Sequence, residues 1–192
     1  MSTTQFTGEQ LKSLSVPVGD IQATGTPSSS TYLRGDGTWA SLGTIPNMFS
    51  LSSIKASVGI TELPFILFKN PIASGKVILF YQIAISSSHV QSGSWVRFKF
   101  YSNPTTSANG SSISIGTVNF GSGSTSVALA YNTPTVSANG SLWNDISVLS
   151  GTSFLFTFPL GSKLQANQTT LITVVSDSVG REATASLIWD EQ

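Results

Sequence analysis

The sequence predicts an all-β protein: an antiparallel β-sandwich or jelly-roll-like head that follows an extended N-terminal arm. Three observations predict this class, namely short apolar runs that alternate with polar residues, turn-forming clusters between those runs, and no convincing long helical pattern. The 192 residues are enough for one well-buried domain and an appendage. We expect the arm to span residues 1–48 and the head to span residues 49–192.

The expected arm lacks strand-like alternation. It contains Pro17, Pro27 and Pro46 among many Ser, Thr and Gly residues, and only the stretch GEQLKSLS (8–15) has the pattern of one or two helical turns. A segment with so few apolar residues has little core of its own. We therefore expect it to be flexible, or to be ordered by packing against another chain.

The head is expected to contain about eight strands. The clearest is SWVRFKFYS (94–102), where Val96, Phe98 and Phe100 fall on one face, a period of two that is typical of a half-buried strand. Clusters rich in Asn, Pro, Gly and Ser separate the strands and predict turns, among them NPTTSANGSS (103–112) and NTPTVSANGS (132–141). The other strands are expected at 64–70, 76–86, 112–120, 125–131, 153–158, 169–176 and 182–190.

One internal echo falls within these turn clusters. TTSANGS (105–111) matches TVSANGS (135–141), and Pro104 and Pro134 keep the same offset. Each copy contains Asn-Gly, a strong signal for a tight turn, because both residue types tolerate positive φ. We favour two similar loops. The alternative is a paired surface formed by both copies at one end of the sandwich.

Composition excludes several classes of function. The formal net charge is zero and 9% of residues are charged, with the lysines scattered, so we expect no nucleic-acid partner. Cysteine is absent, which excludes disulfides, thiolate catalysis and Cys-based zinc sites. No apolar run approaches the roughly 18 residues of a membrane span, and the N-terminus is polar. We expect a chain that is made in a cytoplasm and does not insert into membranes.

No motif indicates an enzyme or a cofactor. The single histidine, His89, lies between expected strands, and no nucleophile elbow accompanies it. The stretch ending in Gly75-Lys76 fails the phosphate-loop pattern, because Asn70 stands where the first glycine should be. The few acids form no calcium loop, and we expect no buried pair of carboxylates. We therefore expect a protein that is not an enzyme and binds neither metal nor cofactor.

Aromatic residues are the best candidates for ligand contact. Trp95, Tyr101, Tyr131 and Trp143 are of the types that stack on sugar rings, although packing in the core or against another subunit is the commoner use. Trp95 and Tyr101 share the polar face of their expected strand, which favours an exposed or intersubunit role. The candidate ligand-binding positions are Trp95, Tyr101, Asn109, Asn139 and Trp143.

The arm contains ATGTPSSSTYLRGDGTWA (23–40), whose centre Arg34-Gly35-Asp36 is a tripeptide read by some adhesion receptors. From Gly25 to Trp39 the stretch resembles, without a gap, a segment of bacteriophage tail-fibre and minor virion structural proteins. LFKNPIASGKVILFYQI (67–83) and ATASLIWDEQ (183–192) resemble small phage β-sandwich domains more loosely.

The resemblance implies a trimeric protein of the virion surface, in which this segment joins an anchoring region to a β domain. We expect an oligomer junction here, because three copies together can bury apolar surface that one thin segment cannot. Its residues are Tyr32, Leu33, Arg34, Gly35, Asp36, Gly37 and Trp39. The expected partners are copies of the chain itself, capsid or tail proteins that hold the arm, and a host surface glycan or protein.

Two functions fit this resemblance nearly equally. The first is a receptor-binding tail fibre or spike, whose head contacts the host. The alternative is a capsid decoration, cement or head-fibre protein that stabilises the capsid lattice, and the short chain favours it. A depolymerase ranks well below both, because it needs a catalytic site that the sequence does not contain. We rank binding to adhesion receptors through Arg34-Gly35-Asp36 low, because nothing in the sequence indicates a eukaryotic extracellular context.

Overall fold

The computed structural model describes residues 31–33, 39–41, 47–88, 93–118 and 124–192. These residues form strands, turns and loops, and no helix. The chain divides into two compact units, residues 1–45 and 46–192. In the first unit, β1 (Thr31–Leu33) and β2 (Trp39–Ser41) pair antiparallel, with Leu33 opposite Trp39.

The second unit consists of two antiparallel sheets and a short two-stranded ribbon. Its strands are β3 (Met48–Val58), β4 (Leu63–Lys69), β5 (Ile78–Ser87), β6 (Trp95–Ser102), β7 (Thr105–Ala108), β8 (Ser111–Ser112), β9 (Gly116–Thr117), β10 (Leu129–Asn132), β11 (Thr135–Ala138), β12 (Ser141–Leu149), β13 (Ser153–Thr157), β14 (Lys163–Leu164), β15 (Thr169–Ser176) and β16 (Arg181–Glu191).

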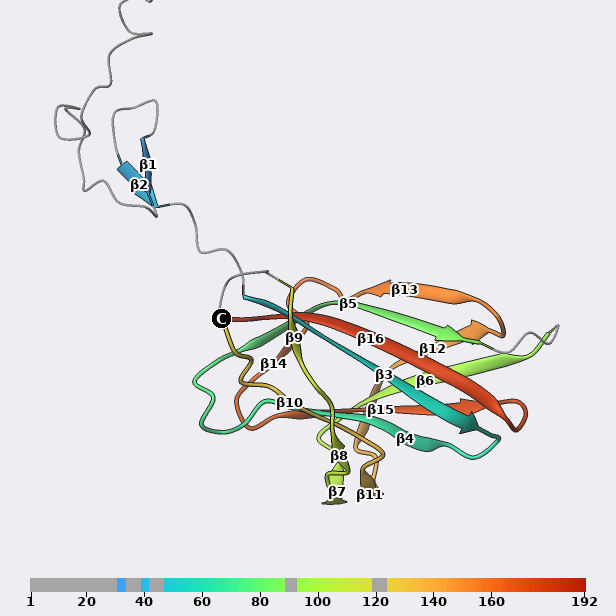
Figure 1. The fold of residues 1–192 in the computed structure, drawn as a ribbon. Helices are drawn as coiled ribbons and strands as arrows, with labels where there is room; N and C mark the ends of the chain where they lie inside the picture. Colours follow the sequence, from blue (N-terminus) through green and yellow to red (C-terminus); the bar gives the residue numbers. More distant parts are fainter. Residues whose placement is uncertain (1–30, 34–38, 42–46, 89–92, 119–123) are drawn as a thin grey trace, which may run out of the picture. The chain divides into compact units, whose positions relative to one another are not determined.

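The two sheets have the strand order of a jelly roll. One, here called the β5 sheet, runs β13-β5-β16-β3-β9, with β14 paired to β5. The other, the β4 sheet, runs β12-β6-β15-β4-β10-β8. Successive long strands alternate between the sheets except for β6 and β12, which pair with each other in the β4 sheet (Figure 1), and β7 to β11 are inserted between these two strands. The expected all-β, jelly-roll-like sandwich is therefore confirmed.

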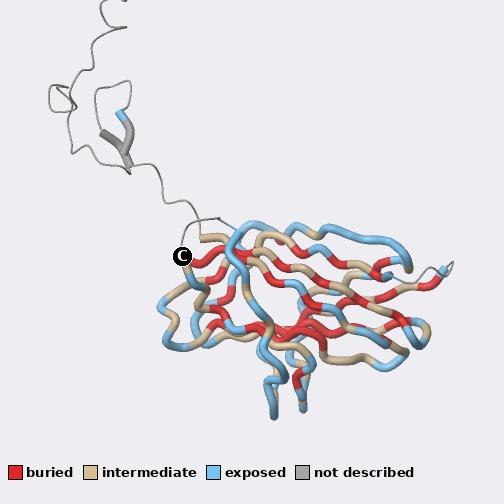
Figure 2. Tube along the Cα trace, in the orientation of Figure 1, coloured by how far each residue is buried: buried red, intermediate tan, exposed pale blue. Residues whose placement is uncertain are grey.

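The core lies between the two sheets and is rich in aromatic rings. Trp189 of β16 is fully buried, and its ring meets Phe68 of β4 edge-on at a centroid distance of 4.9 Å. Phe49 of β3 packs on the same indole at 6.1 Å. Figure 2 shows the buried residues along the central strands and the exposed ones along β13 and the β7/β11 ribbon. Burial of large aromatic side chains supplies much of the stabilisation of such a core.

Six of the expected strands match long strands of the structure, and two long strands were missed. β3 was missed because its inward positions change from Phe49 and Leu51 to Ser53, which blurs the alternation. β12 begins inside a predicted turn cluster. The expected strands 112–120 and 125–131 are strand only at β8, β9 and β10, so most of the described residues of these two ranges are connecting chain.

Two adjacent acids near the C-terminus are buried, contrary to expectation. Glu191 and Asp190 are 5% and 1% exposed. The Glu191 carboxylate accepts hydrogen bonds from Trp189 Nε1 (3.1 Å), Ser126 Oγ (2.5 Å) and the Val127 amide (2.9 Å). Buried carboxylates require such donors, and here the bonds fix the chain that leads into β10. The two acids are structural.

Candidate functional site

The two SANGS segments pair with each other. β7 and β11 form an antiparallel ribbon in which Thr135 lies opposite Ala108 and Val136 opposite Thr106. Figure 1 shows this ribbon projecting from the sheet that contains β4 and β15. The favoured interpretation as two similar loops is therefore wrong, since the two copies are strands that pair with each other. The Asn-Gly dipeptides directly follow the two strands and belong to no strand.

The connection from β6 to β8 and the connection from β10 to β12 cross over the β4 sheet in opposite directions. The chain leaves β6 through β7 and returns as β8 beside β10, whereas it leaves β10 through β11 and returns as β12 beside β6. Each connection therefore crosses over the two central strands, β15 and β4. Beneath the crossing, Leu67, Leu171 and Tyr101 form a second small buried cluster, and Tyr131 and Val136 pack against it.

Close backbone contact at two glycines makes the crossing possible. A Cβ atom on Gly140 would lie 2.1 Å from the carbonyl oxygen of Ser102, and one on Gly110 would lie 2.0 Å from that of Asn132. Both glycines have positive φ, +91° and +89°. Only glycine satisfies both conditions, because any side chain would meet backbone atoms at these distances. The repeated Asn-Gly sequence thus provides the glycine that each of these two equivalent backbone contacts requires.

A polar cluster holds one side of the ribbon to the outer face of the β4 sheet. Glu62 Oε1 accepts hydrogen bonds from Thr173 Oγ1 (2.7 Å), Tyr101 Oη (2.8 Å) and Asn139 Nδ2 (3.1 Å). Its other oxygen, Oε2, pairs with Lys99 Nζ at 2.6 Å. Two of the candidate ligand-binding residues, Tyr101 and Asn139, therefore meet here, where their polar groups bond to the protein itself.

The cluster shifts the pKa values of its members. Partial burial raises the pKa of Glu62, but the hydrogen bonds from Lys99, Thr173 and Tyr101 outweigh it, so the net pKa lies below the ordinary value. The hydrogen bond to Glu62 raises the pKa of Lys99. Burial, followed by the bond to Glu62, raises the pKa of Tyr101. Glu62 and Lys99 therefore stay charged near neutral pH.

The other SANGS segment has a simpler contact. Lys69 Nζ donates a hydrogen bond to Asn109 Oδ1 at 2.7 Å and lies 6.0 Å from the centre of the Tyr131 ring. Asn109 and Asn139 are thus both held, by a lysine and by a carboxylate respectively.

Trp95 lies away from these residues along the sheet. It begins β6, at the end of the strand opposite to Tyr101. Its ring stacks on the Arg97 guanidinium at 4.9 Å, and its backbone amide donates to Asp177 Oδ2. The structure therefore does not bring Trp95 together with the other candidate positions.

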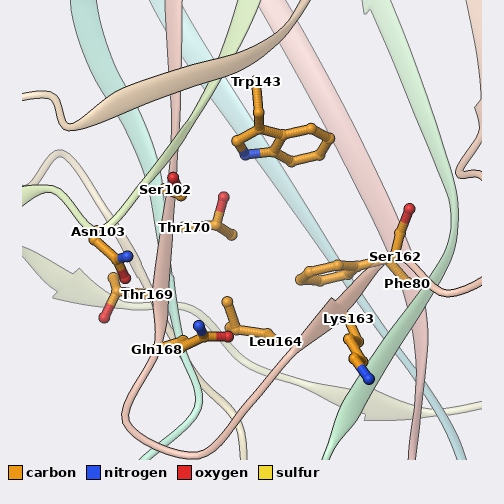
Figure 3. Close-up of a pocket in the computed structure, with 10 residues that line it drawn as sticks. All are labelled: Phe80, Ser102, Asn103, Trp143, Ser162, Lys163, Leu164, Gln168, Thr169 and Thr170. Atoms are coloured by element: carbon orange, nitrogen blue, oxygen red, sulfur yellow. The ribbon is translucent and has the colours of Figure 1, made fainter.

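Trp143 lines a hollow of about 330 Å³, shown in Figure 3. The hollow lies between β5 and β14 of one sheet and β6, β12 and β15 of the other. This volume is at the lower end of the range typical of small-ligand sites. The lining residues are Phe80, Ser102, Asn103, Trp143, Ser162, Lys163, Leu164, Gln168, Thr169 and Thr170.

A β-bulge directs Trp143 toward the hollow. Leu142 pairs with Tyr101 and Asn144 with Phe100, so Trp143 is the extra residue in β12. A bulge places two residues opposite one and re-aims a side chain. The Trp143 ring accordingly contacts the inward Phe100 ring at 5.3 Å, while 42% of the residue stays exposed.

Several polar groups at the hollow have no partner within the described part of the chain. They are the Trp143 Nε1 donor, the Lys163 ammonium, the Asn103 side-chain amide and the hydroxyls of Ser162 and Thr169. The hollow therefore presents an aromatic surface together with free donors and acceptors. Such a combination suits a polar ligand with an apolar face, of which a sugar ring is the common example.

Asn70 holds the loops that form one side of the hollow. It is 1% exposed, and its Nδ2 donates to the carbonyl oxygens of Leu164 and Lys76, each at 2.9 Å. Its backbone amide donates to the carbonyl of Gln168. No motif in the sequence indicated this role, since Asn70 is only the last residue of the expected strand 64–70.

The junction residues fall only partly within the described chain. Tyr32 and Leu33 belong to β1 and Trp39 to β2, and Leu33 is 42% exposed. Arg34, Gly35, Asp36 and Gly37 lie outside the described residues. His89 lies outside them as well.

The described residues contain no group of three or more His, Asp or Glu side chains placed to hold a metal ion. Among these same residues, no helix has the length and apolar character needed to cross a membrane.

Comparisons with known proteins identify no relative. No protein-family model matches the chain, and a search of curated proteins finds no significant sequence match.

We expect Gly140→Ala to lower the free energy of unfolding by about 2 kcal/mol or more, because the new Cβ strains the backbone and meets the Ser102 carbonyl. Gly161→Ala is the matched control. Gly161 also has a φ of +91°, but nothing lies within 4 Å of its added Cβ. The control should cost about 1 kcal/mol. Urea unfolding measures both, and equal losses would contradict a steric requirement at the crossing.

We expect Glu62→Gln to remove part of the acid sensitivity of the head. The lowered pKa of folded Glu62 means that the unfolded chain binds more protons in the acid range, so stability falls as pH drops through the folded-state pKa. The contribution is about 1 kcal/mol or less, because the pair is partly exposed. Unfolding free energies between about pH 7 and pH 3 measure it. Glu182→Gln is the control, and an equally flattened profile there would refute the assignment.

Proposed function

We propose that this chain is a non-catalytic structural protein of a bacteriophage virion, a tail fibre or spike whose head binds the host surface. The resemblance of Gly25–Trp39 to a segment of phage fibre and minor virion proteins supports a place on the virion surface. The observation that carries the host-binding role is the hollow beneath the half-exposed Trp143. Its ligand in this proposal is a glycan of the host envelope.

The proposal includes a homotrimer whose arm attaches to other virion proteins. The β1/β2 hairpin has only two strands of three residues each. An isolated two-stranded hairpin is marginally stable in water, so packing against other copies would stabilise it. The apolar types at Tyr32, Leu33 and Trp39 are suited to that packing.

Capsid decoration is the second candidate, and a different observation favours it. The edge strands β12 and β13 expose large apolar side chains, with Leu149 at 61%, Leu155 at 57% and Phe154 at 47%. Apolar residues on exposed edge strands are typical of contact surfaces. A cement protein would bury such an edge against a neighbouring capsid subunit.

We expect Trp143→Ala to weaken binding of the purified head to bacteria or envelope polysaccharide at least tenfold, equivalent to about 1.4 kcal/mol. Loss of the indole removes the aromatic surface of the hollow without removing a core residue. Trp95→Ala is the control, since Trp95 stacks on Arg97 and lies outside the hollow. Biolayer interferometry measures both, and unchanged binding by Trp143→Ala would rule out the hollow as the receptor site.

Copy number separates the two candidate functions. A fibre or spike should be present in a few to tens of copies per particle, whereas a decoration protein covers a lattice and should number in the hundreds. Quantitative mass spectrometry of purified virions, referenced to the major capsid protein, measures this number. A count in the hundreds would overturn the fibre assignment and favour decoration.

A further inference from the structure

We infer that the hollow beneath Trp143 binds an acidic saccharide, with a sugar ring against the indole and the sugar carboxylate paired with Lys163. This inference rests on the proposed glycan-binding function and specifies the ligand class.

Charge at the hollow selects for an anion. Lys163 is the one charged residue among the ten that line the hollow, and no Asp or Glu accompanies it. Within the described chain its ammonium makes no hydrogen bond or ion pair, whereas Lys99 pairs with Glu62 and Lys69 bonds to Asn109. An unpaired cation beside neutral polar groups favours a ligand that brings one negative charge.

The arrangement of the lining matches a sugar that carries a carboxylate. In Figure 3 the Trp143 indole lies on one side of the hollow and Lys163 on the opposite side, with the Phe80 ring between them and the lysine nitrogen at the end farthest from the indole. Lys163 is exposed and has a flexible stem, so a change of rotamer would let its ammonium meet an acidic group that extends from a ring stacked on the indole. The side chains of Asn103, Gln168 and Thr169 lie along the remaining side and can bond to ring hydroxyls.

A single lysine also favours a carboxylate over a phosphate. Phosphate sites in proteins generally combine several donors, such as the backbone amides of a helix start or a glycine-rich nest with a lysine or arginine. The described chain has no helix, and the hollow offers one cation. One carboxylate against one ammonium balances the charge.

The test uses the full-length protein and oligosaccharides of uronic and sialic acids, each beside its carboxyl-reduced counterpart. Reduction keeps the ring and the linkage and removes the charge. We expect at least one acidic member to bind about tenfold more tightly than its reduced form, with a preference that weakens at high salt. Lys163→Gln should remove this preference, and calorimetric titration measures it.

Lys76→Gln is the control, because Lys76 is a half-buried lysine that does not line the hollow. It should leave the preference intact. Equal binding of acidic and reduced sugars, or an unchanged preference in Lys163→Gln, would overturn the inference.

The outcomes separate the inference from the proposed function. If the protein binds bacteria in a Trp143-dependent way but prefers no acidic sugar, the inference fails and the glycan-binding function stands. If neither bacteria nor any saccharide binds and Trp143→Ala changes nothing, both fail. If Lys163→Gln loses all binding and its unfolding temperature is lowered, Lys163→Arg is measured as well. Lys163→Arg keeps the charge and should restore the preference for acidic over reduced sugars.

Discussion

The contact between two glycines and two strand ends determines how the exposed parts of the head are arranged. Gly140 lies against the backbone of Ser102, and Gly110 lies against that of Asn132. These contacts allow two connections to cross over the β4 sheet and exchange partners. β12 begins directly after Gly140, so the same contact sets the register of β12 on β6. The bulge that aims Trp143 at the hollow follows within three residues.

Few charges are present, and those near the crossing have defined partners. Glu62 joins the β4 sheet to the ribbon through Lys99, Tyr101 and Asn139. Arg97 pairs with Asp145 across β6 and β12, at 3.5 Å and partly exposed. Such pairs add little net stability at a surface, but they favour one register over its alternatives. Lys163 has no such partner in the described chain, and among the described lysines it is the one that lines the hollow.

The sequence predicted the β-sandwich but not which of its strands pair with each other. Alternation in Val96, Phe98 and Phe100 identified β6, because inward positions there are uniformly apolar. Alternation failed in β12, where the bulge shifts the pattern by one residue at Trp143. The repeated SANGS sequence predicted a tight turn at each Asn-Gly dipeptide. It could not reveal that β7 and β11 pair, because hydrogen-bond partners on separate connections depend on the fold of the whole sheet.

For the candidate site, the sequence predicted one lining residue but not the hollow itself. Trp143 was among the residues expected to contact a ligand, but its hollow is built from five strands and their loops, separated by up to ninety residues of chain. Asn70 fixes one side of this hollow through two carbonyl groups, although its surroundings read as an ordinary turn. The core rings of Trp189 and Phe68 do not line the hollow, but Phe68 packs against Phe80, which does, at a centroid distance of 5.4 Å. Because the lining side chains other than Phe80, Leu164 and Thr170 are at least partly exposed, the hollow can change its ligand without changing the scaffold.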